Sequence, residues 1–398
     1  MRLIPPGTGA VLRSPDEAHR TSTPLELLFD LCFVVAVAQV AAELHHGVAD
    51  HHVGTTIIGY ALTFFAIWWA WVNFTWFASA HDSDDVVYRL LTLLQMTGVL
   101  VLAAGVHEAV VDRDFTVVVV GYVVMRLALV TQWLRVARDH PAERPRALRY
   151  AVGISVLQVL WVARLALPDA FDLPSFALLM AAEMWVPWSG ERRGVLRFNA
   201  EHVVERYGLF TIIVLGEAIL AATLAVNDAI DAQGLSFEVL VVALSALVTA
   251  FALWWVYFAR PGEIERERPW TSFLWGYGHL PVFAGIAAFG AGVQVATDSL
   301  IDAEEVSARS ASITVTLGVA IALAGLVIVN LGATDVRTRR MQAAIVALAG
   351  ALVVVGLIAP VVAAMALTAL AVAGLVVWKV VQHGASGVVA QEGAAIDG

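Results

Sequence analysis

Long apolar runs alternate with short polar segments along almost the whole chain. A helix needs roughly 20 predominantly apolar residues to cross the hydrocarbon core of a bilayer. Runs of about this length predict twelve transmembrane helices, at residues 24–46, 55–79, 86–108, 115–136, 147–167, 174–189, 206–226, 236–259, 272–297, 310–332, 341–358 and 360–382. The sixth run is short and contains Glu183 and Pro187, and the last two runs meet at Pro360. The pattern therefore predicts an all-α membrane protein.

Composition supports this class. Hydrophobic residues make up 60% of the 398 positions and charged residues 15%, whereas soluble domains are nearer half apolar and a quarter charged. The formal charge of −10 lies in the predicted loops, so it indicates no nucleic-acid partner, and the expected environment is a lipid bilayer. Cys32 is the single cysteine, which excludes an intrachain disulfide and a cysteine-based metal site.

The basic residues predict the orientation. Cytoplasmic loops collect Lys and Arg, and 20 of the 24 basic residues fall on alternate segments that begin with the N-terminal tail. The four exceptions are Arg113, Arg126, Arg164 and Arg309. We therefore expect both termini to be cytoplasmic, in the cytoplasmic membrane of a bacterium.

The two halves of the sequence resemble each other. Residues 65–69 (FAIWW) match 251–255 (FALWW) at a shift of 186, and residues 98–106 match 285–293 at a shift of 187. Six spans per copy would give two parallel six-helix repeats related by an axis along the membrane normal. The predicted organisation is an N-terminal cytoplasmic tail (1–23), a first repeat (24–190), an amphipathic cytoplasmic linker (191–205), a second repeat (206–382) and a disordered cytoplasmic tail (383–398).

Four sequence motifs occur in order along this framework. They are TPLELLFDLCFV at 23–34, HDSDD at 81–85 followed by YRLL at 88–91, ERYGLFTIIVLGE at 205–217, and GHLP at 278–281. Together they resemble the bacterial low temperature requirement protein A family over roughly residues 20 to 380. The resemblance implies a multispanning membrane protein linked to growth in the cold. It supplies no settled biochemical activity and no catalytic residues.

Two acids lie near the start of the first predicted helix. Thr23, Pro24 and Glu26 have the spacing of a capping box, which explains Glu26 as part of a helix start. Asp30 lies a turn deeper, where a carboxylate is costly in a bilayer and is expected to be paired or functional. Its structural explanation is an ion pair, for which Arg126 is the expected partner. Its functional explanation is transport or gating.

The second half carries an acid at the position equivalent to Asp30. Glu217 lies inside the seventh run, three helical turns after Arg206, so these two side chains share a face and cannot touch. His279 is a candidate partner of Glu217. If Asp30 and Glu217 face one cavity, they could bind a cation or share a proton. Two separate helix-packing bonds are the structural alternative.

Further candidate side chains include Glu183 in the sixth run and two polar loops. Imidazole-rich tracts suit zinc or copper, and one loop carries four histidines, namely His45, His46, His51 and His52. The second loop carries Asp82, Asp84 and Asp85, which suit a divalent cation. Helix capping and a pair with Arg89 are the simpler explanation of these acids. Aromatic residues gather at membrane interfaces, so the tryptophans near residues 68–76 and 254–255 predict a belt and helix packing.

The expected function is transport or channel activity for an ion or small solute, not enzymatic catalysis. Asp30 and Glu217 would bind the ion or proton, with a proton or monovalent cation as the coupling species and no other cofactor. An intramembrane enzyme acting on lipid or isoprenoid through the Asp-rich loop is one alternative. A membrane stability factor without a site is another. A homo-oligomer is compatible with the sequence.

Overall fold

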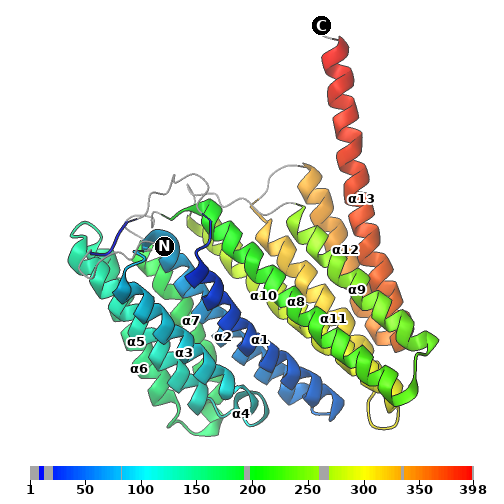
Figure 1. Ribbon diagram of the computed structural model, residues 1–398, viewed down its shortest axis with the longest axis horizontal. Helices are drawn as coiled ribbons and strands as arrows, with labels where there is room; N and C mark the ends of the chain where they lie inside the picture. Colours follow the sequence, from blue (N-terminus) through cyan, green and yellow to red (C-terminus); the bar gives the residue numbers. More distant parts are fainter. Residues whose placement is uncertain are drawn as a thin grey trace. The chain divides into compact units, whose positions relative to one another are not determined.

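The computed structural model describes residues 9–12, 21–81, 83–191, 198–259, 269–332 and 336–396, with side chains except at 269–270, 336–337 and 383–396. In this part of the chain the regular structure is entirely helical. The elements of the first half are α1 (Pro24–Ala49), α2 (Val53–His81), α3 (Val86–Ala104), α4 (Val106–Val111), α5 (Thr116–Asp139), α6 (Arg144–Arg164), the 3-10 helix η1 (Asp169–Phe171) and α7 (Asp172–Glu191). Those of the second half are α8 (Ala200–Gln233), α9 (Phe237–Phe258), α10 (Pro269–Ile301), α11 (Ala308–Val329), α12 (Val336–Ile358) and α13 (Val361–Ile396) (Figure 1).

Eleven of the described helices are long and apolar enough to cross a membrane. This confirms the predicted class: the protein is an all-α multi-pass membrane protein. The sixth predicted span corresponds to α7, which is a helix of 20 residues but is not among those eleven. Its acids, prolines and tryptophans lower its hydropathy, and Pro187 lies inside the helix.

The structure revises three predicted boundaries. The run at 86–108 is divided at Gly105, where α3 ends and the short helix α4 begins. The predicted linker at 191–205 overlaps α8, which begins at Ala200 because Asn199 accepts a hydrogen bond from the His202 backbone N–H and caps it; residues 192–197 of that linker lie outside the described residues. Helix α13 continues to Ile396, although residues 383–398 were expected to be disordered.

The described chain forms two compact units that divide inside α8, between Ile213 and Val214. Unit 1 holds most of the chain before this point, and unit 2 holds most of the chain after it together with residues 45–52. In unit 1, α3 packs on α5, α5 on α6 and α6 on α7, and these helices lie side by side (Figure 1). Among the membrane-spanning helices of unit 1, α2 is the most deeply buried, with Trp68, Trp69 and Trp71 all at 1% exposure or less.

Glycines allow close helix approach in both units. In unit 1, Gly98 of α3 and Gly121 of α5 face each other so closely that a Cβ on Gly121 would lie 2.5 Å from the Gly98 carbonyl oxygen. In unit 2, Gly285 of α10 meets Gly318 of α11 in the same way, and a Cβ on Gly285 would lie 2.6 Å from the Gly318 carbonyl oxygen. Small residues let helix backbones pack closely within a membrane, where apolar burial alone supplies little attraction.

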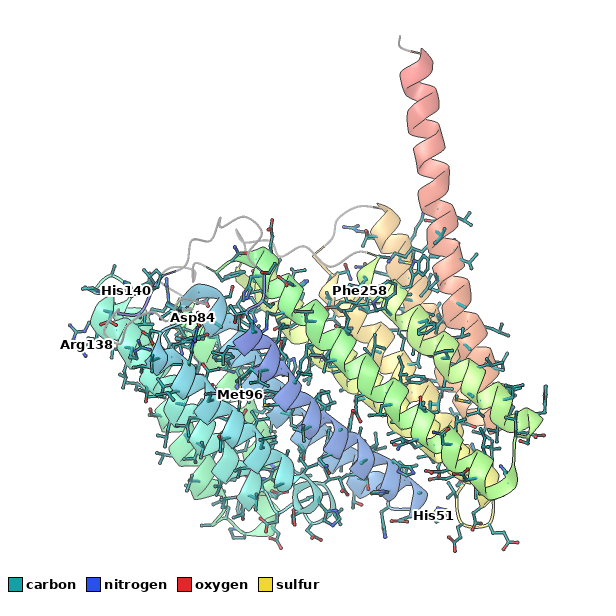
Figure 2. All side chains as sticks on the ribbon, viewed as in Figure 1. His51, Asp84, Met96, Arg138, His140 and Phe258 are labelled. Atoms are coloured by element: carbon teal, nitrogen blue, oxygen red, sulfur yellow. The ribbon has the colours of Figure 1, made fainter. Side chains whose placement is uncertain are left out.

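The loops at one end of unit 1 are held by charges. Asp84, Arg138 and His140 lie together at this end, whereas Met96 lies half-way along α3 (Figure 2). Asp139 accepts a hydrogen bond of 2.8 Å from the Ala10 backbone N–H, which fixes part of the N-terminal segment to the end of α5. The bundle thus has a polar end where α2, α5 and α7 finish and α1, α3, α6 and α8 begin.

The Gly98–Gly121 contact predicts a specific sensitivity. Gly121→Ala is expected to destabilise the protein by about 2 kcal/mol, because the added methyl group meets backbone atoms that cannot move aside. Gly350→Ala in α12 is the control, since no atom lies within 4 Å of a Cβ there, and it should leave stability unchanged or raise it by up to about 1 kcal/mol. Thermal unfolding in detergent measures both, and equal effects would contradict the close packing.

The link between α1 and α4 predicts a pH dependence. His107 Nδ1 lies 3.0 Å from Glu43 Oε2, and the hydrogen bond and negative charge of Glu43 raise the pKa of His107. A raised pKa in the folded state means that the pair stabilises the protein below about pH 6.5 and that this contribution is lost as pH rises through the raised value. His107→Gln should therefore lower the unfolding temperature only on the acidic side. The His107 side chain is exposed, so the effect is expected to be small, and a difference that persists at alkaline pH would contradict the assignment.

Candidate functional site

Four charged or titratable side chains form a buried network in unit 1. Glu26 and Asp30 come from the first turns of α1, and His202 and Arg206 come from the first turns of α8. All four are at 1% exposure or less. Each pair is spaced four residues apart, so each lies on one face of its helix, and the two faces meet.

Arg206 is the centre of this network. Its Nη2 and Nε donate to the two oxygens of Asp30 at 2.5 and 3.1 Å, and its Nη1 donates to Glu26 Oε1 at 3.2 Å. This two-bond fork with Asp30 is the geometry that guanidinium groups favour with carboxylates. The predicted pair of Asp30 with Arg126 is therefore wrong: the partner of Asp30 is Arg206, which the sequence analysis considered only in relation to Glu217.

The other contacts complete the network. Trp71 of α2 donates its indole N–H to Asp30 Oδ1 at 2.7 Å, and Trp71 stacks on Phe210 of α8 with ring centroids 4.4 Å apart. His202 Nε2 lies 3.2 Å from Glu26 Oε1. The His202 Nδ1 atom is buried and has no hydrogen-bond partner among the described residues.

Glu26 has two roles. The Thr23 backbone N–H donates to Glu26 Oε2 at 2.8 Å, and the Glu26 backbone N–H donates to Thr23 Oγ1 at 3.3 Å. The predicted capping box is thus confirmed. The same carboxylate also contacts Arg206 and His202, which the capping box alone does not indicate.

Arg126 and Glu183 form a second buried pair in unit 1. Arg126 Nη2 donates to Glu183 Oε2 at 3.3 Å and to the Tyr122 hydroxyl at 3.3 Å. Trp69 of α2 donates its indole N–H to the same Glu183 oxygen at 2.9 Å. Trp69 and Trp71 of α2 are therefore buried in helix packing, one half of the prediction, and bind acids there, which was not predicted. Trp254 and Trp255 of α9 are 45% and 47% exposed, as a belt requires.

The predicted residues of unit 2 do not form a joint site. Glu217 is half-buried, and no hydrogen bond or ion pair of its side chain is found among the described residues. His279 is not its partner, because His279 Nε2 lies 3.1 Å from the Tyr257 hydroxyl and Nδ1 lies 2.8 Å from the Trp275 carbonyl oxygen. The relation between Glu217 and Asp30 stays a prediction.

The described acids of the Asp-rich loop bind groups of the protein itself. Asp85 caps α3 by accepting a 2.7 Å hydrogen bond from the Tyr88 backbone N–H and also binds Arg135. Asp84 binds Arg89 through two hydrogen bonds of 2.7 and 2.8 Å, while Asp82 lies outside the described residues. These contacts support the capping explanation of the loop.

In the histidine-rich segment, His45 Nε2 lies 2.5 Å from Asp298 Oδ2, whereas His46, His51 and His52 are exposed. Within the described ranges, no three His, Cys, Asp or Glu side chains are grouped to hold a metal ion.

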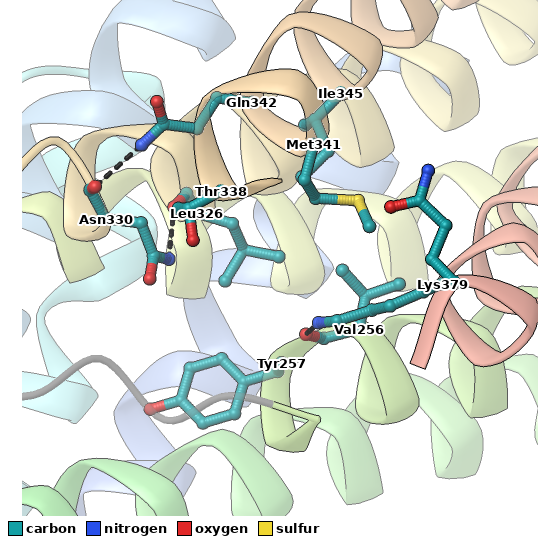
Figure 3. Close-up of a pocket in the computed structure, with 10 residues that line it drawn as sticks. Val256, Tyr257, Leu326, Asn330, Thr338, Met341, Gln342, Ile345 and Lys379 are labelled. Atoms are coloured by element: carbon teal, nitrogen blue, oxygen red, sulfur yellow. Dashed lines mark hydrogen bonds between the residues drawn. The ribbon is translucent and has the colours of Figure 1, made fainter. Parts of the chain in front are cut away.

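Unit 2 also has a small cavity, of about 60 Å³, between α9, α11, α12 and α13 (Figure 3). Lys379 of α13 is only 8% exposed and donates to the Val256 carbonyl oxygen at 3.3 Å, near the C-terminal end of α9. This contact satisfies a carbonyl group that the helix leaves without a partner.

Residues 21–379 match the family described as Bacterial low temperature requirement A protein (LtrA). The chain belongs to this family. A relative from Rhizobium meliloti (strain 1021), named Uncharacterized protein RA0937, is 28% identical over 280 residues. That match covers 66% of each chain, so this chain spans just under two thirds of the length of the relative. No solved structure matches at a significant level.

The LtrA motifs at 23–34 and 205–217 carry most of the buried network, since they contain Glu26, Asp30 and Arg206. Sequence reasoning missed His202, because it lies in the segment predicted as a linker. The signal that could have revealed it is the four-residue spacing of His202 and Arg206, which mirrors that of Glu26 and Asp30.

Arg206 is predicted to be the most sensitive member of this network. Arg206→Gln leaves two buried carboxylates without their main counter-charge, and we expect a loss of about 3–5 kcal/mol of stability. Asp30→Asn should cost less, because Arg206 keeps Glu26. The double variant Asp30→Asn, Arg206→Gln should be more stable than Arg206→Gln alone. Unfolding measurements on this cycle test the pairing, and strict additivity would contradict it.

Proposed function

We propose that this LtrA protein moves protons, or a small cation or solute coupled to protons, across the bacterial cytoplasmic membrane. The proton-binding site is the network of Glu26, Asp30, His202 and Arg206. One observation carries the proposal: within the described residues, two buried carboxylates face a single guanidinium, and an imidazole is the only other partner able to carry positive charge.

The charge balance of the network depends on protonation. With His202 neutral, two negative charges face one positive charge, and the buried network carries a net charge of −1. Protonation of His202 or of one carboxylate brings the net charge to zero. Because a charge is costly within a bilayer, release of this proton favours entry of another cation. Proton and cation binding are therefore coupled at one place.

His202 is suited to receive the proton. When its Nε2–H donates to Glu26, the Nδ1 atom carries a lone pair that can accept a proton without breaking that bond. The Nδ1 atom has no partner among the described residues, so protonation displaces no existing hydrogen bond.

The orientation follows from the basic residues. We propose that both termini are cytoplasmic, because most arginines lie on segments at that side. The network lies in the first turns of α1 and α8, so it would be reached from the cytoplasmic side.

We also propose that the two halves of the chain are copies of one repeat. Gly98 and Gly285 match at a shift of 187. Gly98 packs against Gly121 of a neighbouring helix, and Gly285 packs against Gly318 in the same way. On this proposal Glu217 is the counterpart of Asp30, and the second copy has lost the arginine partner.

Proton flux into liposomes that contain the purified protein tests the proposed function. A pH-sensitive dye inside the vesicles reports flux under a potassium or sodium gradient. We expect His202→Gln and Asp30→Asn to lower the flux roughly tenfold or more, because each removes a member of the proposed proton-binding network. Glu43→Gln, an acid of the same helix outside the network, is the matched control and should keep most of the flux.

His202→Lys separates a transport role from a structural one. A lysine supplies the positive charge that balances the network but does not release its proton at neutral pH, so the variant should fold and yet lose flux. Wild-type flux in this variant, or in both His202→Gln and Asp30→Asn, would overturn the assignment. The absence of proton, potassium and sodium flux in the wild type would overturn the proposed function.

A further inference from the structure

Helix α2 links two buried acids. Trp69 and Trp71 are two residues apart, so their side chains leave the helix on nearly opposite sides. Trp71 donates to Asp30 of α1, and Trp69 donates to Glu183 of α7. Two buried acid–arginine pairs, Asp30 with Arg206 and Glu183 with Arg126, are therefore joined to the same helix, one on each side.

The two pairs differ in how well they are satisfied. Both oxygens of Asp30 accept hydrogen bonds from Arg206. Glu183 uses only Oε2, and its Oε1 has no partner among the described residues, although the residue is 2% exposed. The Nε and Nη1 atoms of Arg126 likewise have no partner in that part of the chain. Buried polar atoms are normally hydrogen-bonded, so this pair is incomplete without a further group.

A cavity adjoins the unsatisfied acid. It has a volume of about 20 Å³ and lies between α2, α5, α6 and α7. Aromatic side chains form most of its wall, and its lining side chains carry three polar groups, the Glu183 carboxylate, the Tyr122 hydroxyl and the Trp161 indole N–H; the aromatic residues are Phe65, Phe115, Tyr122, Trp161 and Phe176. A space of roughly 10–15 Å³ is enough for one water molecule if polar partners are present.

The cavity extends toward the opposite end of unit 1 from the Glu26–Asp30 network. Phe115 directly precedes α5 and Phe176 lies in the second turn of α7, so both are near the end where α6 finishes and α7 begins. Arg164 stands at this end, with its guanidinium carbon 5.2 Å from the Phe176 ring centroid, and it binds Asp172. On α7, Glu183 follows Phe176 by about two helical turns, so it lies about 10 Å further from this end of unit 1.

We propose that Glu183 is a second proton-binding carboxylate of this protein, and that the aromatic-walled cavity admits water to it from the α6–α7 end of unit 1. This inference rests on the proposed function and adds a second proton site, which serves the opposite face of the membrane. The transferred group is a proton alone: one O–H bond of a hydronium ion that reaches the cavity breaks, an O–H bond to Glu183 Oε1 forms, and a water molecule is left.

The surroundings of Glu183 fit this role. Arg126 and Tyr122 face it from α5, Trp69 faces it from α2, and Trp161 of α6 lines the same cavity. Arg126 is the only charged side chain in contact with Glu183 within the described ranges. On α7 itself the other acids, Asp172 and Glu191, lie at the two helix ends. A proton on Glu183 therefore changes the charge of a single isolated pair.

Infrared spectroscopy of the purified protein tests the proton site directly. A protonated buried carboxylic acid gives a C=O stretching band that vanishes as pH rises. Glu183→Gln should remove such a band, and Glu191→Gln, the same change on the same helix, should leave it in place. A spectrum that Glu183→Gln does not alter would overturn the proposal.

Silver ions test the access route without altering the acid–arginine pair. The experiment starts from the Cys32→Ala variant, which contains no cysteine. Val118 lines the cavity, whereas Val120 of the same helix faces outward. Val118→Cys and Val120→Cys therefore each place a single thiol, one in the cavity and one outside it. In proteoliposomes, silver ions added on the α6–α7 side should react at least roughly tenfold faster at position 118 than at position 120, because only the former meets water. Equal rates at the two positions would overturn the route.

Flux measurements distinguish this proposal from the proposed function on which it rests. Glu183→Gln should lower proton flux roughly tenfold, while Glu191→Gln should not. If the Glu183 band titrates but the wild type shows no flux, the proposed function fails and the proton site stands. If flux depends on Asp30 and His202 but not on Glu183, the second site is wrong and the proposed function stands.

Discussion

Charges buried in a bilayer persist only when they face opposite charges, and this constraint organises unit 1. Arg206 binds both Asp30 and Glu26, and removal of Arg206 would leave two uncompensated carboxylates where water cannot reach. The first turns of α1 and α8 must therefore pack against each other with a fixed rotation. Trp71 adds a hydrogen bond from α2, so three helices are held by one network.

A second buried ion pair, which has fewer hydrogen bonds, holds other helices of unit 1 together. Arg126 and Glu183 join α5 to α7, and Trp69 joins both to α2. Apolar packing alone selects helix neighbours weakly in a membrane, because lipid tails are as apolar as the side chains they replace. Close glycine contacts and buried polar bonds thus supply the specificity. On the proposed function, the buried carboxylates and the His202 imidazole that form these bonds would also take up and release the proton.

Unit 2 shares the close glycine contacts of unit 1 but differs in its buried charges. Its helices pack through Gly285 and Gly318 as unit 1 packs through Gly98 and Gly121. However, Glu217 has no arginine partner in the described chain, and His279 forms a hydrogen bond with Tyr257 instead. The pattern of close backbone contacts is shared, whereas the buried arginine–carboxylate pairs found among the described residues lie in unit 1.

The sequence by itself determined the class of the protein, most of its spans, the capping box at Thr23 and Glu26, and the family, because apolar run length and local spacing are properties of contiguous residues. It also marked Asp30 and Arg206 as residues of interest. Only the tertiary structure decided that these two residues bind each other, that Arg126 binds Glu183, and that His202 belongs to the network. A residue 176 positions away in sequence becomes a partner through helix packing alone. The four-residue spacing on each helix indicates which face is charged, but not which other helix that face will meet.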